Sequence, residues 1–230
     1  MNKRFYLLGL LSVFLLGTSV SCKDKDKDKK KSYCTQSPGN CESILAAKEF
    51  FLFKEGSWWV YEEETSLERD SVYVTEYVNS SSYDFDMRVK SALTDYEYHY
   101  WPLYVSSNGC STNGSIQNKC IYINRSKGKP LDYVGESKIF FINYKIGDYI
   151  YTGSDLDYCL DNKIIIDDIQ NTFTLNDLNF NKTIIIKELC SFVEGKQPTV
   201  HYYSKGVGII RKEFLDSNEV WNLVSYHIAP

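Results

Sequence analysis

The chain has 230 residues, of which 43% are hydrophobic and 15% aromatic, and its 26 basic and 30 acidic residues give a net charge of −4. The nine residues from Lys23 to Lys31 hold six lysines and three aspartates, so the chain that follows carries 18 basic and 27 acidic residues, a net charge of −9. Because nucleic-acid binding depends on neutralising phosphates with Lys and Arg, this balance excludes a nucleic-acid partner.

The first 21 residues have the layout of a secretory signal peptide. Lys3 and Arg4 give a positive end, the twelve residues Phe5–Leu16 form an apolar run, and small residues follow up to Ser21. Such a run is too short to cross a bilayer as a helix, which takes about 20 residues, and it suits a cleaved leader. We therefore expect residues 1–21 to be a signal peptide and the protein to be exported.

The residue after this leader, Cys22, resembles a lipidated cysteine. The segment "TSVSC" is similar to the lipobox of bacterial lipoproteins, and a loose lipobox followed by a charged run resembles those of Bacteroidetes outer-membrane lipoproteins. The resemblance implies that Cys22 carries lipid such as palmitate and that the outer membrane is the location, with either an inward or a surface-exposed orientation. A cut by a conventional signal peptidase is the alternative, because Ser19 stands where lipoboxes usually have Leu.

Residues 22–33 are expected to form the lipidated end and a charged tether. Alternating Lys and Asp hold too little apolar surface to fold. The positive charge of the tether suits contact with anionic lipid head groups. The membrane is therefore a predicted partner through the N-terminal lipid, and the folded domain is expected to cover residues 34–230.

Six further cysteines suit an exported protein. With Cys22 assigned to lipid, an even number remains, which predicts disulfides in an oxidising compartment. The sequence alone does not determine the pairing, but short loops favour the pairs Cys34–Cys41, Cys110–Cys120 and Cys159–Cys190. A zinc site is disfavoured because no C-x-x-C occurs and the three histidines have no ligand spacing. We expect no metal and no other cofactor.

The body of the chain has the periodicity of β-strands almost throughout. In "YDFDMRV", Tyr83, Phe85, Met87 and Val89 alternate with charged residues, which places the apolar side chains on one face of a sheet. About ten such segments, rich in β-branched and aromatic residues, are separated by turn residues. We expect a single antiparallel all-β domain, built as a curved sheet, an open barrel or a sandwich.

Two stretches decide how the body is divided into elements. The segment "CESILAAKEFFLF", residues 41–53, predicts one short N-terminal helix, because Ile44, Ala47 and Phe51 fall at helical spacing. Its Phe-rich end would equally suit the start of the first strand. Further along, "NKIIIDDI" and "NTFTLND" are interpreted as two separate strands.

Both ends of the body resemble small Bacteroidetes lipoproteins of the all-β type. "FLFKEGSWWVYE" is similar to their opening strand, and "SKGVGIIRKEF" followed by "WNLVSYHI" is similar to their closing hairpin. This resemblance supplies no catalytic residue. Gly56 is expected to permit a turn, and Gly206 and Gly208 to permit a bulge or a close backbone approach. The tryptophans expected to pack on the core are Trp58, Trp59 and Trp221.

The candidate binding residues are aromatic. "YEYHYWPLY" places Tyr96, Tyr98 and Tyr100 on one face of a strand, with Trp101 beside them. Aromatic faces stack on sugars and other flat apolar groups, and Tyr adds a hydroxyl that can hydrogen-bond. The alternative is that Tyr simply covers a half-buried sheet surface well. These four residues are the predicted ligand-binding site.

The expected function is non-catalytic binding of a ligand or partner by an anchored envelope protein. The sequence contains no nucleophile elbow, zinc-helix motif or phosphate loop, so no catalytic residue is assigned. A glycan, a small ligand or another envelope protein is the expected partner. Two alternatives stay open: a structural or accessory subunit of an envelope complex, and a hydrolase that uses paired carboxylates at an acidic site.

Overall fold

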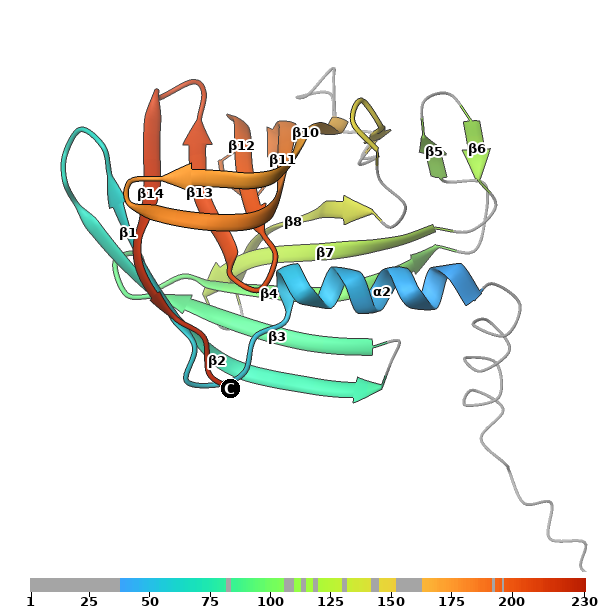
Figure 1. Cartoon of the computed structure of the whole chain (residues 1–230), viewed down its shortest axis with the longest axis horizontal. Helices are drawn as coiled ribbons and strands as arrows, with labels where there is room; N and C mark the ends of the chain where they lie inside the picture. Colours follow the sequence, from blue (N-terminus) through green and yellow to red (C-terminus); the bar gives the residue numbers. More distant parts are fainter. Residues whose placement is uncertain are drawn as a thin grey trace, which may run out of the picture. The chain divides into compact units, whose positions relative to one another are not determined.

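The computed structural model describes residues 38–81, 84–105, 110–112, 115–117, 120–129, 132–141, 145–151, 163–191, 193–195 and 197–230. The leader, Cys22, the tether, Cys34 and Cys159 lie outside these residues, so the expectations about them stay predictions. The described part contains one helix, α2 (Pro38–Phe51), which precedes the strands (Figure 1). No described helix is long and apolar enough to cross a membrane.

Twelve strands of the described part form one antiparallel sheet, in the order β8-β7-β4-β3-β2-β1-β14-β13-β12-β11-β10-β9. Their bounds are β1 Trp58–Glu63, β2 Arg69–Ser81, β3 Asp84–Ser91, β4 Glu97–Val105, β7 Cys120–Lys129, β8 Asp132–Phe141, β9 Tyr149–Tyr151, β10 Lys163–Leu175, β11 Leu178–Ser191, β12 Gln197–Ser204, β13 Gly208–Phe214 and β14 Glu219–His227. A separate hairpin pairs β5 (Cys110–Thr112) with β6 (Ser115–Gln117).

The large sheet is strongly curled. In Figure 1 the green strands β3, β4 and β7 run across the view, whereas the red strands β13 and β14 run up it. The first strand of this sheet, β1, lies beside the last, β14, in an antiparallel ladder. The prediction of an all-β antiparallel domain with a curved sheet and one short helix is therefore confirmed for the described residues.

Alternation along the strands decides which side chains enter the core. On β3, Phe85, Met87 and Val89 are buried with exposed fractions of 1%, 3% and 5%, as the sequence pattern predicts. On β1, Trp59 is buried, but Trp58 is 40% exposed. The expectation that Trp58 packs on the core is wrong, because consecutive residues of a strand point to opposite faces of the sheet.

The structure resolves one element boundary that the sequence left open and corrects another. The Phe-rich end of the predicted helix belongs to α2, which ends at Phe51, well before β1 begins. The two strands predicted from "NKIIIDDI" and "NTFTLND" are one strand, β10. The polar residues between them do not end the strand, because its ladder with β11 continues past a bulge between Ile166 and Asp168.

Helix α2 fills part of the interior of the curl. Its residues Ala47, Phe50 and Phe51 are at most 2% exposed. The ring of Phe51 lies 4.9 Å from that of Tyr203 on β12, so the helix packs on the inner face of the sheet. Directly after the helix, the ring of Phe53 meets Trp59 edge-on at 5.2 Å. The aromatic residues of the helix end and of the first strands thus share one core.

The turn between β12 and β13 depends on two glycines with positive φ. Gly206 has φ +73° and Gly208 has φ +90°. A methyl group at Gly208 would lie 3.1 Å from the ring of Phe53, whereas nothing lies within 4 Å of the same position at Gly206. The predicted close backbone approach is therefore present at Gly208, where the hairpin meets the aromatic core.

Substituting these two glycines separates backbone strain from crowding. A non-glycine residue in this left-handed region costs about 1–2 kcal/mol, so Gly206→Ala should lower the free energy of unfolding by about that amount. Gly208→Ala should cost at least about 1 kcal/mol more, because the Phe53 ring must also move. Urea titration followed by circular dichroism measures both. Equal losses of unfolding free energy in the two variants would show that the contact with Phe53 does not affect stability.

Candidate functional site

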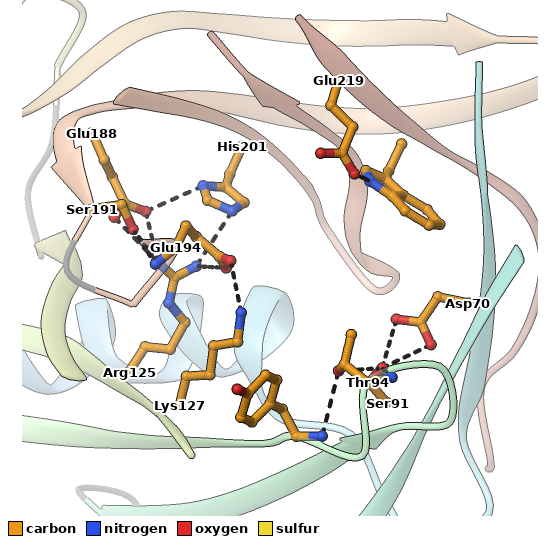
Figure 2. Close-up of polar contacts among 12 residues, drawn as sticks. Asp70, Ser91, Thr94, Arg125, Lys127, Glu188, Ser191, Glu194, His201 and Glu219 are labelled. Atoms are coloured by element: carbon orange, nitrogen blue, oxygen red, sulfur yellow. Dashed lines mark hydrogen bonds and ion pairs between the residues drawn. The ribbon is translucent and has the colours of Figure 1, made fainter. Parts of the chain in front are cut away.

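A cluster of buried charged side chains lies inside the curl, centred on Arg125 of β7. The side chain of Arg125 is 1% exposed. Its Nη2 lies 3.2 Å from both carboxylate oxygens of Glu188 and 3.5 Å from Ser191 Oγ. Its Nη1 lies 3.8 Å from Glu194 Oε1. Figure 2 shows these groups converging on the guanidinium from the opposite side of the interior.

The partners of Arg125 come from β11, the turn after it, and β12. Glu188 and Ser191 belong to β11, Glu194 to the turn, and His201 to β12. In the ladder between these two strands, Ile186 is opposite His201, and both are fully buried. Glu188 follows Ile186 by two residues, so strand alternation brings its carboxylate to the same inward face.

Lys127, two residues after Arg125 on β7, also belongs to the cluster. Its Nζ lies 3.3 Å from Glu194 Oε2. Its ammonium also lies 4.9 Å from the ring centre of Tyr96 and 5.5 Å from that of Tyr98, a distance at which a cation is attracted to an aromatic face. The carboxylate of Glu194 is therefore held between two cations.

These contacts keep both carboxylates ionised. Burial alone would raise the pKa of Glu194, but Arg125 and then Lys127 outweigh burial and lower it to about 2. Burial likewise opposes ionisation of Glu188, and the attraction of Arg125 together with the His201 contact lowers its pKa below the usual range. An ionised carboxylate in an apolar interior is stable only with such partners.

His201 is the neutral member of the cluster. Burial is the largest cause that lowers the pKa of His201, and Arg125 adds to it. Its Nε2 lies 3.3 Å from Arg125 Nη1 and accepts from it, which places the ring proton on Nδ1. That atom is 3.2 Å from Glu188 Oε1 but makes no hydrogen bond.

Lys212 on β13 differs from the other cations. It lies opposite His201 in one ladder and opposite Trp221 in the other, so it faces the same interior, and its side chain is half-buried. Its Nζ is 4.6 Å from the ring centre of Tyr61. Among the described residues, none of the ion pairs within 4.0 Å includes Lys212. Burial lowers the pKa of Lys212, and the attraction of Glu194 opposes this only in part.

A cavity of about 50 Å³ lies where the charged cluster meets the aromatic core. A buried water needs about 10–15 Å³ of such space, so the cavity has room for a few waters or a small organic group. Its charged and ionisable lining residues are Arg125, Glu194, His201, Lys212 and the tyrosines 61, 98, 100 and 203. Its other lining residues are Phe50, Phe51, Phe53, Trp59, Val72, Met87, Val89, Gly208 and Ile209.

The four aromatic residues predicted to bind a ligand do not lie together. Tyr98 and Tyr100 line the cavity, whereas Tyr96 is half-buried and does not. Trp101 is on the other face of β4, where its ring stacks on that of His99 at 4.3 Å. Alternation along β4 separates Trp101 from the tyrosines, so the structure places two of the four candidates at one site.

The charged residues of the site were not among the sequence-based candidates. Arg125, Glu188 and Lys212 each follow an apolar residue by two positions in a strand: Ile123, Ile186 and Ile210 respectively. That spacing is a signal that a charge could face inward with the core residues. It is a weak one, because a bulge can reverse the direction of a strand's side chains, as occurs between β12 and β13.

The cysteines are described only in part. Cys190 on β11 is 6% exposed and disulfide-bonded. Its predicted partner, Cys159, lies outside the described residues, so that pairing stays a prediction. Cys41, Cys110 and Cys120 belong to described elements, but their side chains lie outside the described part. The pairs predicted for them stay predictions as well.

No family model matches the chain, and no characterised protein or solved structure was found to be similar to it. The chemistry of the cavity and of the charged cluster is therefore the basis for the functional argument. In the described residues, no group of three or more His, Cys, Asp or Glu side chains is arranged to hold a metal ion.

The lowered pKa of Glu194 predicts a loss of stability in acid. A carboxyl whose pKa is about 2 when folded and 4.5 ordinarily binds its proton more readily in the unfolded chain. Its contribution is therefore complete above about pH 4.5 and lost as the pH falls toward 2, amounting to roughly 3 kcal/mol. Glu194→Gln should be less stable than the wild type at pH 7 and should lose less stability between pH 5 and pH 2.

Urea titrations across this pH range measure the effect. Glu55→Gln, a change at an exposed position, is the matched control and should follow the wild-type profile. Parallel profiles for Glu194→Gln and the wild type would contradict the assignment of this acid sensitivity to Glu194.

Proposed function

We propose that this chain is an exported, lipid-anchored cell-envelope protein that binds a small ligand inside its curled sheet without catalysing a reaction. The observation that carries the proposal is the cavity in which an aromatic wall and a charged wall meet. Ligand sites in proteins are typically concave and mainly apolar, with a few polar groups that orient the ligand. The cavity has this composition, although it is small.

The state of the acidic groups favours binding over catalysis. A general acid at neutral pH needs a carboxyl with a raised pKa, as one member of the catalytic pair in glycoside hydrolases has. Here the two carboxyls of the charged cluster, Glu188 and Glu194, have lowered pKa values. His201 lies between Arg125 and Glu188 with both ring nitrogens facing them. The proposed function therefore assigns no catalytic residue.

The outer face of the sheet supports a second candidate, docking to another envelope protein. Trp58 and Tyr73 are cross-strand partners of β1 and β2, and they are 40% and 41% exposed. His227 of β14 is the partner of Trp58 on its other side, with the two rings 6.3 Å apart. Exposed aromatic residues of this kind are enriched at protein interfaces. The interior cavity is the better-supported site because its lining combines buried aromatic side chains with charged groups.

A cavity-filling substitution tests the ligand-binding proposal. Val89→Phe places a larger side chain in the cavity wall, and Val78→Phe makes the same change at a 42% exposed position of β2. A ligand at a hundred times its Kd stabilises a protein by about 2.7 kcal/mol, which raises the Tm of a domain of this size by about 5–10 °C. In a thermal-shift screen of small organic compounds, we expect such shifts for the wild type and Val78→Phe and none for Val89→Phe.

Circular dichroism at 25 °C shows whether each variant is folded before the screen. The binding proposal fails if folded Val89→Phe keeps every thermal shift that the wild type shows, because the compounds would then bind elsewhere.

Lipid anchoring is tested at Cys22. Cys22→Ala removes the only thiol that the lipobox resemblance assigns to lipid, so we expect the variant to lose a metabolically incorporated palmitate label and to leave the membrane fraction. Ser21→Ala keeps a small residue before the cysteine and should be labelled like the wild type. Retention of label and membrane association by Cys22→Ala would rule out this anchor.

A further inference from the structure

The cations around the cavity are not all paired. Arg125 and Lys127 both form ion pairs with the carboxylates of Glu188 and Glu194. Lys212 also lines the cavity, where its ammonium faces the ring of Tyr61. Among the described residues, it has no carboxylate partner within 4.0 Å.

The other acidic group that acts on Lys212 is already engaged. The carboxylate of Asp70 on β2 attracts Lys212. However, both Asp70 oxygens accept from the Ser91 hydroxyl at 2.9 Å, and one also accepts from the backbone N–H of Leu93 at 3.1 Å. Figure 2 shows this carboxylate turned to the Ser91 loop. The hydrogen bonds of Asp70 are thus directed to the β3–β4 turn, and its carboxylate forms no ion pair with Lys212 within 4.0 Å.

Three other groups beside the cavity also have unused hydrogen-bonding capacity. Among the described residues, Arg125 Nε, His201 Nδ1 and Tyr203 Oη are buried with no hydrogen-bond partner, and all three residues line the cavity. A buried polar group without a partner is costly. A wall that carries these donors and an ammonium without an ion pair is arranged to receive an acceptor with negative charge.

On the basis of the ligand-binding function proposed above, we infer that the cavity binds the carboxylate of a small organic acid, with Lys212 as its counter-charge. One carboxylate would pair with the one cavity-lining cation that has no ion pair among the described residues, whereas a doubly charged phosphate would bring one negative charge more than Lys212 can pair. The apolar part of the lining, which includes Phe53, Trp59 and Val72, would receive the apolar remainder of the acid. A cavity of about 50 Å³ limits that remainder to a few carbon atoms.

Isothermal titration calorimetry with three probes tests the inference. Propionate carries the carboxylate, propionamide has the same shape without the charge, and methylphosphonate is a tetrahedral anion. We expect the wild type to bind propionate at least tenfold more tightly than either of the other two. Lys212→Met should abolish the preference for propionate over propionamide, and Lys212→Arg should keep part of it.

Lys205→Met is the matched control. Lys205 lies in the neighbouring turn, where its exposed ammonium pairs with Glu49 at 3.0 Å, so its loss should leave the affinity for propionate unchanged. A second readout separates binding from folding. Lys212→Met should raise the Tm of the ligand-free protein, because it replaces a half-buried ammonium that has no ion pair among the described residues. A residue needed only for the fold would lower the Tm instead.

The outcomes distinguish this inference from the proposed function. If Val89→Phe blocks propionamide as well as propionate and the wild type binds both equally, the carboxylate inference fails and the binding function stands. Tighter binding of methylphosphonate than of propionate overturns the inference in the same way, and so does the absence of any propionate binding. Propionate affinity that survives in both Lys212→Met and Val89→Phe overturns the inference and the interior site together.

Discussion

The guanidinium of Arg125 ties together two parts of the sheet that lie far apart in strand order. Its strand, β7, is next to the β8 edge, and the strands of Glu188 and His201 lie toward the β9 edge. In the described residues, no backbone ladder joins these two edges. The Arg125–Glu188 ion pair instead joins these two parts of the sheet through side chains. In some proteins, a buried ion pair contributes more to the specificity of a fold than to its net stability.

The need to compensate each buried charge also accounts for the position of the cavity. Apolar side chains of α2 and of the first strands fill one side of the interior, where they can approach one another closely. The charged cluster on the other side needs its own partners at defined distances, because each buried charge must be compensated. The cavity lies along the boundary between the apolar packing and the charged cluster.

The β-fold could be predicted because its signal is local. The alternation of Phe85, Met87 and Val89 determines their burial without knowledge of distant strands. The same rule shows that Trp58 and Trp59 cannot both face inward, whereas their aromatic character alone would place both in the core. Polar residues in the middle of a long strand led to the division of β10, because a solvent-facing stretch of a strand resembles a loop in the sequence.

The charged site could not be predicted, because its contacts are distant in the sequence. Arg125 and its carboxylate partner Glu188 are 63 residues apart, and only the curl of the sheet brings them together. Whether a charged strand residue faces solvent or the interior depends on that curl and on the bulges along each strand. For Tyr96, Tyr98 and Tyr100, spacing identified a shared face, but only the last two reach the cavity.

The ladder between β1 and β14 has a consequence for how the chain folds. Lys54 Nζ donates to the carbonyl of Pro230 at 2.7 Å, and Ala229 N donates to Ser57 Oγ at 3.0 Å, so contacts between distant parts of the chain complete the sheet. Such topologies, with high contact order, fold slowly. Until the last strand is in place, β1 and β13 each present an open edge, which is the surface through which unfinished sheets aggregate.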